Sequence, residues 1–299
     1  MVKDFTDVFY TSSDGLRLYA RDYASTRSTL STANKLPIIC IHGLTRNSSD
    51  FDELAPWLAA QGHRVIAVDV RGRGRSAHDA VSAHYHPWVY AGDIAQLAKT
   101  LHIPRAIFIG TSMGGLITMT LALRKSGLIA AAVLNDVGPY LSPRGLQRIA
   151  SYAGGDAQFA SWDAACAYIR QINCIAFPDN SDEEWEHWAR RAFVKNAQGL
   201  WVLQYDPNIA IAIKTGKLKP SSWLARWAFR RLCRRPCLLI RGEISDLVEA
   251  EQVSAMRALA PAMQYAEVPA VGHAPMMTEA VAQQALLHFL DQIDRCTQI

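Results

Sequence analysis

Short apolar runs in the first half of the chain alternate with segments of helical spacing. The runs lie at residues 36–41, 65–68, 106–109 and 130–134. A continuous apolar run of this length is typical of a strand buried on both faces of a parallel sheet. Between the runs, apolar residues recur at helical spacing in segments 51–60, 90–101 and 113–123. This alternation with short connections predicts parallel strands joined by right-handed crossovers, with helices on both faces of the sheet.

The two ends of the chain extend this pattern. Residues 5–23 alternate around Asp14-Gly15, which predicts an antiparallel hairpin at the start. A Ser- and Thr-rich loop is expected at 24–35. Near the end, runs at 237–240 and 265–268 and a helix at about 278–293 continue the α/β pattern.

The alternation stops between residues 138 and 235, a stretch too long for a structureless loop in a compact domain. It therefore predicts an inserted subdomain. Its spacing is helical, and it contains six of the eight tryptophans. We expect a core formed by residues 1–137 and 236–299, with a helical cap at 138–235. Most of the tryptophans should pack this cap, and one or two should line a pocket.

Composition and charge narrow the function classes. Half of the residues are hydrophobic and 19% are charged, as in a folded globular protein. The net charge of +4 and the scattered basic residues do not predict a nucleic-acid surface. Six cysteines without a C-x-x-C pair indicate neither zinc nor a disulfide framework. Without a signal-peptide pattern or a long apolar span, the chain is expected to be cytoplasmic and not membrane-bound.

A nucleophile is predicted at Ser112. Residues 110–115 read Gly-Thr-Ser-Met-Gly-Gly, directly after the run 106–109 and at the start of a helix. Glycines on both sides allow a tight strand-to-helix turn, which projects the serine hydroxyl from the sheet beside a helix N-terminus. The predicted strand before the motif and the helix after it make the motif a more specific sign of a nucleophile than its residues alone.

A serine hydroxyl needs a base within hydrogen-bond reach, and the base needs a group that fixes its tautomer. His273 follows the run 265–268, and Asp246 follows the run 237–240. Both are expected at the carboxyl edge of the sheet. The chain order serine, aspartate, histidine is that of α/β-hydrolases. We therefore predict His273 as the base and Asp246 as the acid.

Asp136 is the alternative acid, because it follows the run 130–134 and lies at the same edge. Asp246 is preferred on two grounds. Gly242 and Ser245 form the turn expected after the next core strand, and Asp136 stands where the chain leaves the core for the insert. There a carboxylate can cap exposed N–H groups at the start of the insert.

An oxyanion hole is predicted from His42-Gly43, directly after the run 36–41. A loop at this place can direct a backbone N–H to the developing oxyanion, so the N–H groups of Leu44 and Met113 are expected to form the hole. His42 itself is expected to hold the loop by hydrogen bonds.

Together with D-V-R-G-R-G-R-S at residues 69–76, these motifs resemble the capped α/β-hydrolases that include carboxylesterases, enol-lactonases and meta-cleavage C–C hydrolases. The resemblance covers the core and implies an α/β-hydrolase fold, with a mostly parallel eight-stranded sheet and no cofactor. Ser112 excludes the haloalkane dehalogenases and epoxide hydrolases, which have aspartate at this position. Leu44-Thr45-Arg46-Asn47 departs from the glycine- and proline-rich loop usual in C–C hydrolases.

Two other patterns are interpreted as loops. Gly72-x-Gly74 lacks the third glycine and helix start of a dinucleotide site. His84 and His86 have no carboxylate or cysteine at a recognisable metal-ligand spacing, so no metal site is predicted.

The sequence thus predicts a serine hydrolase that cleaves a carboxylic ester or lactone through an acyl-enzyme. Its partner is expected to be a small molecule with an apolar portion, since an aromatic-rich cap favours such a substrate. Cleavage of a carbon–carbon bond beside a carbonyl remains an alternative, as does a non-catalytic ligand receptor on this scaffold. Oligomeric state is left open.

Overall fold

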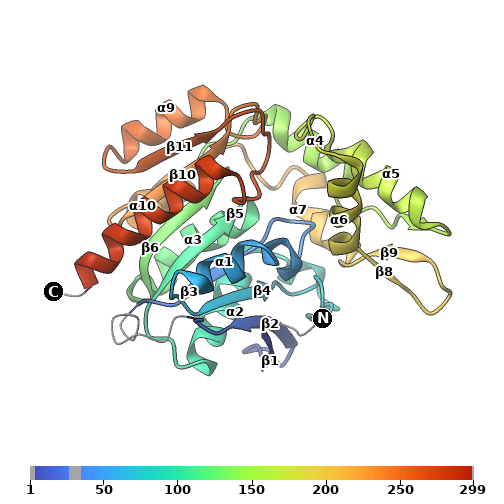
Figure 1. Cartoon of the computed structure of the whole chain (residues 1–299), viewed down its shortest axis with the longest axis horizontal. Helices are drawn as coiled ribbons and strands as arrows, with labels where there is room; N and C mark the ends of the chain where they lie inside the picture. The colour runs from blue at the N-terminus through green and yellow to red at the C-terminus, as the bar shows by residue number, and fades with distance from the viewer. Residues whose placement is uncertain (1–3, 27–34, 298–299) are drawn as a thin grey trace.

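An eight-stranded sheet forms the centre of the computed structural model, which describes residues 4–26 and 35–297 (Figure 1). Its strand order is β1-β2-β4-β3-β5-β6-β10-β11. The bounds are β1 (Thr6–Thr11), β2 (Arg17–Tyr23), β3 (Ile38–Ile41), β4 (Val65–Asp69), β5 (Ala106–Thr111), β6 (Ile129–Asn135), β10 (Cys237–Gly242) and β11 (Gln264–Val268). The strands lie where the apolar runs predict them.

Strand direction divides the sheet into two parts. β1 and β2 form the predicted hairpin, and β2 pairs antiparallel with β4. All pairs from β4 to β11 are parallel. The carboxyl ends of β3, β5, β6, β10 and β11 therefore meet at one edge, which is where ligands bind in open α/β sheets. The expected loop at 24–35 lies largely outside the described residues.

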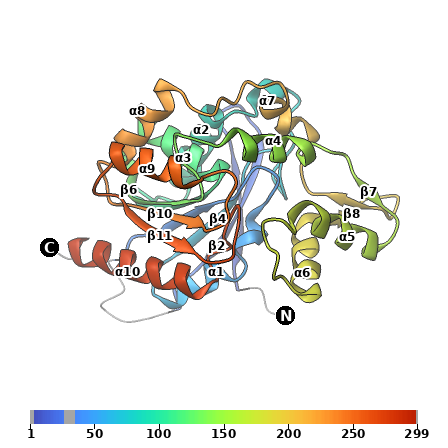
Figure 2. The same ribbon diagram turned by 90° about the horizontal axis from the view of Figure 1, so that it is seen from above.

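Helices cover both faces of the sheet (Figure 2). One face packs against α1 (Leu54–Ala60) and α10 (Ala280–Thr297), through side chains such as Leu58 and Phe289. The other face packs against α2 (Pro87–Thr100), α3 (Met113–Arg124) and α9 (Ala250–Leu259). α2 begins three residues before the predicted segment, because Pro87 fits the first helical turn and the His86 side chain accepts the N–H of Trp88.

The insert contains α4 (Pro143–Tyr152), α5 (Trp162–Asn173), α6 (Asp182–Ala192), α7 (Ile211–Lys214) and α8 (Trp223–Leu232). It also contains a small antiparallel sheet in the order β7-β9-β8, with β7 (Gln158–Phe159), β8 (Phe193–Lys195) and β9 (Trp201–Leu203). These strands are too short to give an apolar alternation visible in the sequence.

The insert packs in two different ways. α5 and α6 share a cluster of their own, in which Trp185 and Trp188 are buried. α8 packs against α3 instead, and its Ala228, Phe229 and Leu232 join the core cluster of that face. Its Trp223 and Trp227 are exposed. Only part of the segment 138–235 therefore stands away from the sheet.

Candidate active site

The turn that carries Ser112 is formed as the glycine pattern predicts. Ser112 lies between β5 and α3 with φ 51° and ψ −111°, a conformation that non-glycine residues seldom adopt. A Cβ at Gly114 would stand 2.0 Å from the carbonyl oxygen of Ile41, and one at Gly115 would stand 2.3 Å from Val137 Cγ1. Side chains there would push α3 away from the sheet. The glycines therefore hold the helix N-terminus close beneath the Ser112 hydroxyl.

His273 joins Ser112 to Asp136. Its Nε2 lies 2.9 Å from Ser112 Oγ, and its Nδ1 lies 2.8 Å from Asp136 Oδ2. Asp136 is fully buried, and its Oδ1 has no hydrogen-bond partner within the described residues. A carboxylate in this position holds the proton on Nδ1, which leaves Nε2 free to accept the serine proton. The arrangement is that of a serine, histidine and aspartate triad.

The preferred acid, Asp246, forms no hydrogen bond to His273 within the described residues, and the structure places the alternative, Asp136, at His273 Nδ1. Asp246 lies in the loop after β10, where both its oxygens accept from the Arg148 guanidinium of α4. Burial raises the pKa of Asp246, but the hydrogen bonds and the charge of Arg148, together with the charge of His273, lower it more, so the pKa is lowered overall. Because β6 lies between β5 and β10, Asp136 is one strand nearer to the Ser112 turn. Its side chain faces His273 and does not cap the insert.

Two polar residues to which the sequence analysis gave no role in the triad hold this arrangement. Ser245 donates from Oγ to Asp136 Oδ2 at 2.6 Å and accepts the N–H groups of Leu247 and Val248. Asn135 donates to the carbonyl of Pro275 at 2.7 Å, which ties the loop of His273 to the end of β6. Both stand beside residues that the sequence does single out, but neither belongs to a recognisable motif.

The loop after β3 lies against Ser112, because a Cβ at Gly43 would stand 3.8 Å from Ser112 Cβ. Within the described residues, the N–H groups of Leu44 and Met113 donate to no other group of the protein. Met113 is the first residue of α3, so its N–H also benefits from the positive end of the helix dipole. These two amides are available for an oxyanion.

His42 holds this loop in its neutral form. Val70 N–H donates to Nε2 at 3.0 Å, so Nδ1 carries the proton and donates to the Gly43 carbonyl at 2.7 Å. Burial is the main cause that lowers the pKa of His42 to about 3. Protonation would break the bond to Val70.

This lowered pKa predicts a pH-dependent stability. Below pH 6.5 the unfolded chain binds a proton at His42 that the folded chain does not, so the free energy of unfolding falls as pH drops from about 6.5 towards 3. Urea unfolding at pH 7 and pH 5 should show a loss about 2 kcal/mol greater in the wild type than in His42→Gln. Equal losses in the two proteins would contradict a buried neutral His42.

The comparisons with known proteins agree with the fold. A model of the alpha/beta hydrolase fold matches residues 37–280. The chain belongs to the α/β-hydrolase family. It is 36% identical, over 253 residues, to the 3-hydroxybutyrate-oligomer hydrolase of Cupriavidus necator, covering 83% of this chain and 85% of the relative.

Two further matches support this family assignment. The 2-(acetamidomethylene)succinate hydrolase of Mesorhizobium japonicum is 27% identical over 85% of this chain and 87% of its own. The crystal structure of an alpha/beta hydrolase from Novosphingobium aromaticivorans is 36% identical and has a TM-score of 0.88, with 98% of this chain and 100% of that chain covered. The chain is therefore a hydrolase of the α/β-hydrolase family.

An apolar cavity of about 630 Å³ opens beside Ser112 in this hydrolase. Helices α2, α3, α4 and α7 each supply two of its lining residues. The lining includes Leu116, Leu146, Ile149, Ile213 and Leu218. A cavity of this lining suits a short aliphatic group next to the reacting carbonyl.

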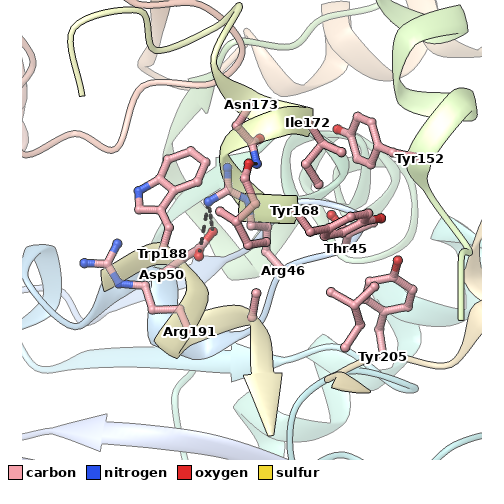
Figure 3. A pocket seen from close by; sticks show the side chains of 13 residues that line it. Thr45, Arg46, Asp50, Tyr152, Tyr168, Ile172, Asn173, Trp188, Arg191 and Tyr205 are labelled. Carbon is pink, nitrogen blue, oxygen red and sulfur yellow. Dashed lines mark hydrogen bonds and ion pairs between the residues drawn. The ribbon is translucent and has the colours of Figure 1, made fainter. Parts of the chain in front are cut away.

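A second cavity, of about 550 Å³, lies beyond the loop that follows β3 and is more polar (Figure 3). Leu44 lines the apolar cavity, and its neighbours Thr45 and Arg46 line this one. The Arg46 guanidinium lies over the Trp188 ring at 4.2 Å and 3.3 Å from Asp50 Oδ2. Trp188 is thus an insert tryptophan at the wall of the second cavity, and no tryptophan of the described residues lines the cavity beside Ser112.

Three tyrosines complete the second cavity on the side away from Arg46 (Figure 3): Tyr152 of α4, Tyr168 of α5, and Tyr205 after β9. Burial is the main cause that raises the pKa of each phenol, so all three keep their protons at neutral pH. Protonated phenols can donate hydrogen bonds to ester or hydroxyl oxygens.

His84, for which the sequence shows no carboxylate at a metal-ligand spacing, does have carboxylate neighbours in space. His84 Nδ1 lies 2.9 Å from Asp79 Oδ2, and Asp14 lies close by. The Arg71 guanidinium bonds to both carboxylates and to Asp93. A guanidinium therefore already supplies the positive charge that these carboxylates need.

Within the described residues, no helix is both long and apolar enough to cross a membrane.

Proposed function

We propose that this hydrolase cleaves carboxylic esters through an acyl-enzyme on Ser112, and that its substrates are short oligoesters of small hydroxy acids. The observation that carries the reaction type is the position of His273 between Ser112 and Asp136, at 2.9 Å and 2.8 Å. The substrate class is supported by the similarity to a 3-hydroxybutyrate-oligomer hydrolase and by the two cavities on either side of the oxyanion loop.

The first half of the reaction forms the acyl-enzyme. His273 Nε2 accepts the Ser112 proton while Oγ attacks the ester carbonyl carbon. The carbonyl oxygen becomes an oxyanion that accepts from the N–H groups of Leu44 and Met113. Asp136 stays ionised and stabilises the imidazolium. When the C–O bond breaks, the leaving alkoxide takes the proton from His273 and departs as an alcohol.

The second half releases the acid. Water loses a proton to His273 and attacks the acyl carbon, and the same two amides hold the second oxyanion. Ser112 then leaves with the proton from His273, and the free acid departs. Each half returns His273 to its neutral form, so the site is ready for another ester bond.

Each of the two cavities binds one of two successive units of such an oligoester. The aliphatic lining beside Ser112 fits the methyl-bearing backbone of one hydroxy acid unit, for which burial of each CH₂ contributes about 0.8 kcal/mol. The phenols of Tyr152, Tyr168 and Tyr205 can donate to the ester and hydroxyl oxygens of the next unit. The charged and polar side chains in the lining of the second cavity, such as Arg46 and Asp50, disfavour a long fatty acyl chain there.

A substrate panel tests this proposal. We expect the dimer and trimer of 3-hydroxybutyrate to be hydrolysed with a higher kcat/KM than an ester of similar size with a plain alkyl chain, with release of the monomer measured by chromatography. Lactones and a dienol-ketone belong in the same panel. Faster turnover of the dienol-ketone than of every ester would overturn the proposal in favour of carbon–carbon cleavage. No turnover of any ester would favour a binding protein.

A further inference from the structure

Arg73 is a buried cation without a carboxylate partner. Its side chain is 0% exposed, and within the described residues its guanidinium forms no ion pair. Neighbouring Arg71 is also buried but bonds to three carboxylates: Asp14, Asp79 and Asp93. Removing a charge from water is costly unless an opposite charge replaces the lost hydration. Burial of the unpaired charge of Arg73 is therefore unfavourable unless it serves another purpose.

The groups that Arg73 bonds to are neutral, and two of them belong to the proposed oxyanion hole. Nε donates to the Leu44 carbonyl at 3.0 Å, and Nη2 lies 3.3 Å from Met113 Sδ. Nη1 donates to the Arg71 carbonyl at 2.8 Å and to the Tyr90 hydroxyl at 2.9 Å. One guanidinium thus contacts both residues proposed to form the oxyanion hole, although Leu44 lies in the loop after β3 and Met113 begins α3.

Aromatic rings surround the same guanidinium. Its carbon lies 5.1 Å from the Tyr90 ring centre and 5.8 Å from that of Tyr85. Asp206 accepts the Tyr85 hydroxyl at 2.6 Å, so this carboxylate is engaged by the phenol. The field of Arg73 is therefore only partly compensated, in surroundings of low polarity where charges act strongly.

We propose that Arg73 is a positioning residue for the oxyanion hole, and that its charge is compensated fully only when the oxyanion forms. It holds Leu44 and Met113 in place from behind, and its positive charge favours the negative transition state over the neutral ester. An interaction that is stronger in the transition state than in the ground state raises kcat. This inference rests on the proposed ester hydrolysis.

A purely structural role would predict something else. The backbone of Arg73 forms a β-bridge with Tyr205, and Gly74 N–H donates to the Gln204 carbonyl, so this loop also joins the core to the insert. If Arg73 served only that junction, its loss would lower stability without a selective effect on the transition state.

The test compares Arg73→Met and Arg73→Lys with Arg231→Met. Arg231 of α8 is a partly buried arginine that bonds to the Ala122 carbonyl and to Ser126, away from the site, and serves as the control. Each variant is assayed for kcat and KM on a 3-hydroxybutyrate dimer ester. The inhibition constant of a matching trifluoromethyl ketone is also measured. Ser112 Oγ adds to this ketone carbon, the serine proton passes to His273, and an oxyanion remains in the hole.

For Arg73→Met we expect kcat to fall about 10- to 100-fold with KM little changed, and the inhibition constant to rise in proportion to the loss in kcat/KM. Arg73→Lys keeps the charge and should recover part of both losses. Arg231→Met should alter thermal stability only. If Arg73→Met does not fold, Arg73→Lys is used for the test. Lysine lacks the several contacts that the planar guanidinium forms, so this variant should still bind the ketone more weakly than wild type.

Unchanged ketone affinity in the folded Arg73 variants would overturn the inference, as would a loss of kcat equal to that of Arg231→Met. Ser112→Ala in the same assay keeps the two proposals separate. If Ser112→Ala is inactive while the Arg73 variants match wild type, ester hydrolysis stands and the role of Arg73 fails. If Ser112→Ala retains full turnover, the proposed function itself fails.

Discussion

Replacement of Ser112 by alanine should lower kcat for ester hydrolysis by roughly 10⁵- to 10⁶-fold, the scale observed when the nucleophile of a serine hydrolase triad is removed. Only the oxygen that attacks the carbonyl is lost. The two cavities and the amides of Leu44 and Met113 remain, so substrate binding should change little. Steady-state kinetics with a 3-hydroxybutyrate dimer measures kcat, and calorimetry with a non-hydrolysable analogue measures binding.

The matched control for this variant is Thr111→Val. Thr111 precedes Ser112 and ends β5, and its Oγ1 accepts a hydrogen bond from Asn135. It should lose little activity, because it has no role in the proton transfers. A Ser112→Ala protein with turnover close to wild type would show that another group attacks the ester.

Asp136→Asn should lower kcat by about 10⁴-fold, because an amide in place of the carboxylate favours the wrong histidine tautomer and cannot stabilise the imidazolium. The substitution preserves shape, and Ser245 can still donate to the amide oxygen. Asp246→Asn should retain most of the activity. It removes one charge of the ion pair with Arg148, so its main effect should be on the contact between α4 and the loop after β10.

The ranking of the two variants, both checked for folding by circular dichroism, decides the acid. A greater loss of kcat in Asp246→Asn than in Asp136→Asn would move the acid to Asp246. The nucleophile and the base would stand in either case.

The sequence indicates Ser112 and His273, which the structure brings within hydrogen-bond distance, because their signals are local. The turn at Ser112 needs glycines, because a Cβ at Gly114 would stand 2.0 Å from the Ile41 carbonyl oxygen. This requirement is visible in the sequence as glycines next to the serine. His273 follows a strand and precedes a helix, so its place at the sheet edge can be predicted from the order of elements. The parallel strands were predicted for the same reason, since their apolar runs are buried on both faces.

The acid could not be settled in this way, because Asp136 and Asp246 both follow strands that end at the same edge. Two structural facts favour Asp136: the strand order, which puts β6 beside β5, and the contact of Asp136 with His273 where Asp246 contacts Arg148. Asp246 pairs with Arg148, a residue of the insert almost a hundred positions away. Its neighbour Ser245 is the residue of that loop that bonds to Asp136.

The insert was predicted least well, for a related reason. The strands β7, β8 and β9 contain two or three residues each, too few to show alternation. α8 has the spacing of an amphipathic helix, but spacing does not say which surface its apolar side meets. Its packing on α3 depends on the path of the chain back to the sheet.

The central claim, an acyl-enzyme on Ser112, is tested most directly by mass spectrometry of the protein quenched in acid during turnover of an activated 3-hydroxybutyrate ester. We predict an intact mass raised by one hydroxybutyryl group, located by peptide mapping on Ser112 and absent from Ser112→Ala. Turnover at full rate without any acyl adduct, or an adduct on another residue that forms and decays at the rate of turnover, would contradict this account.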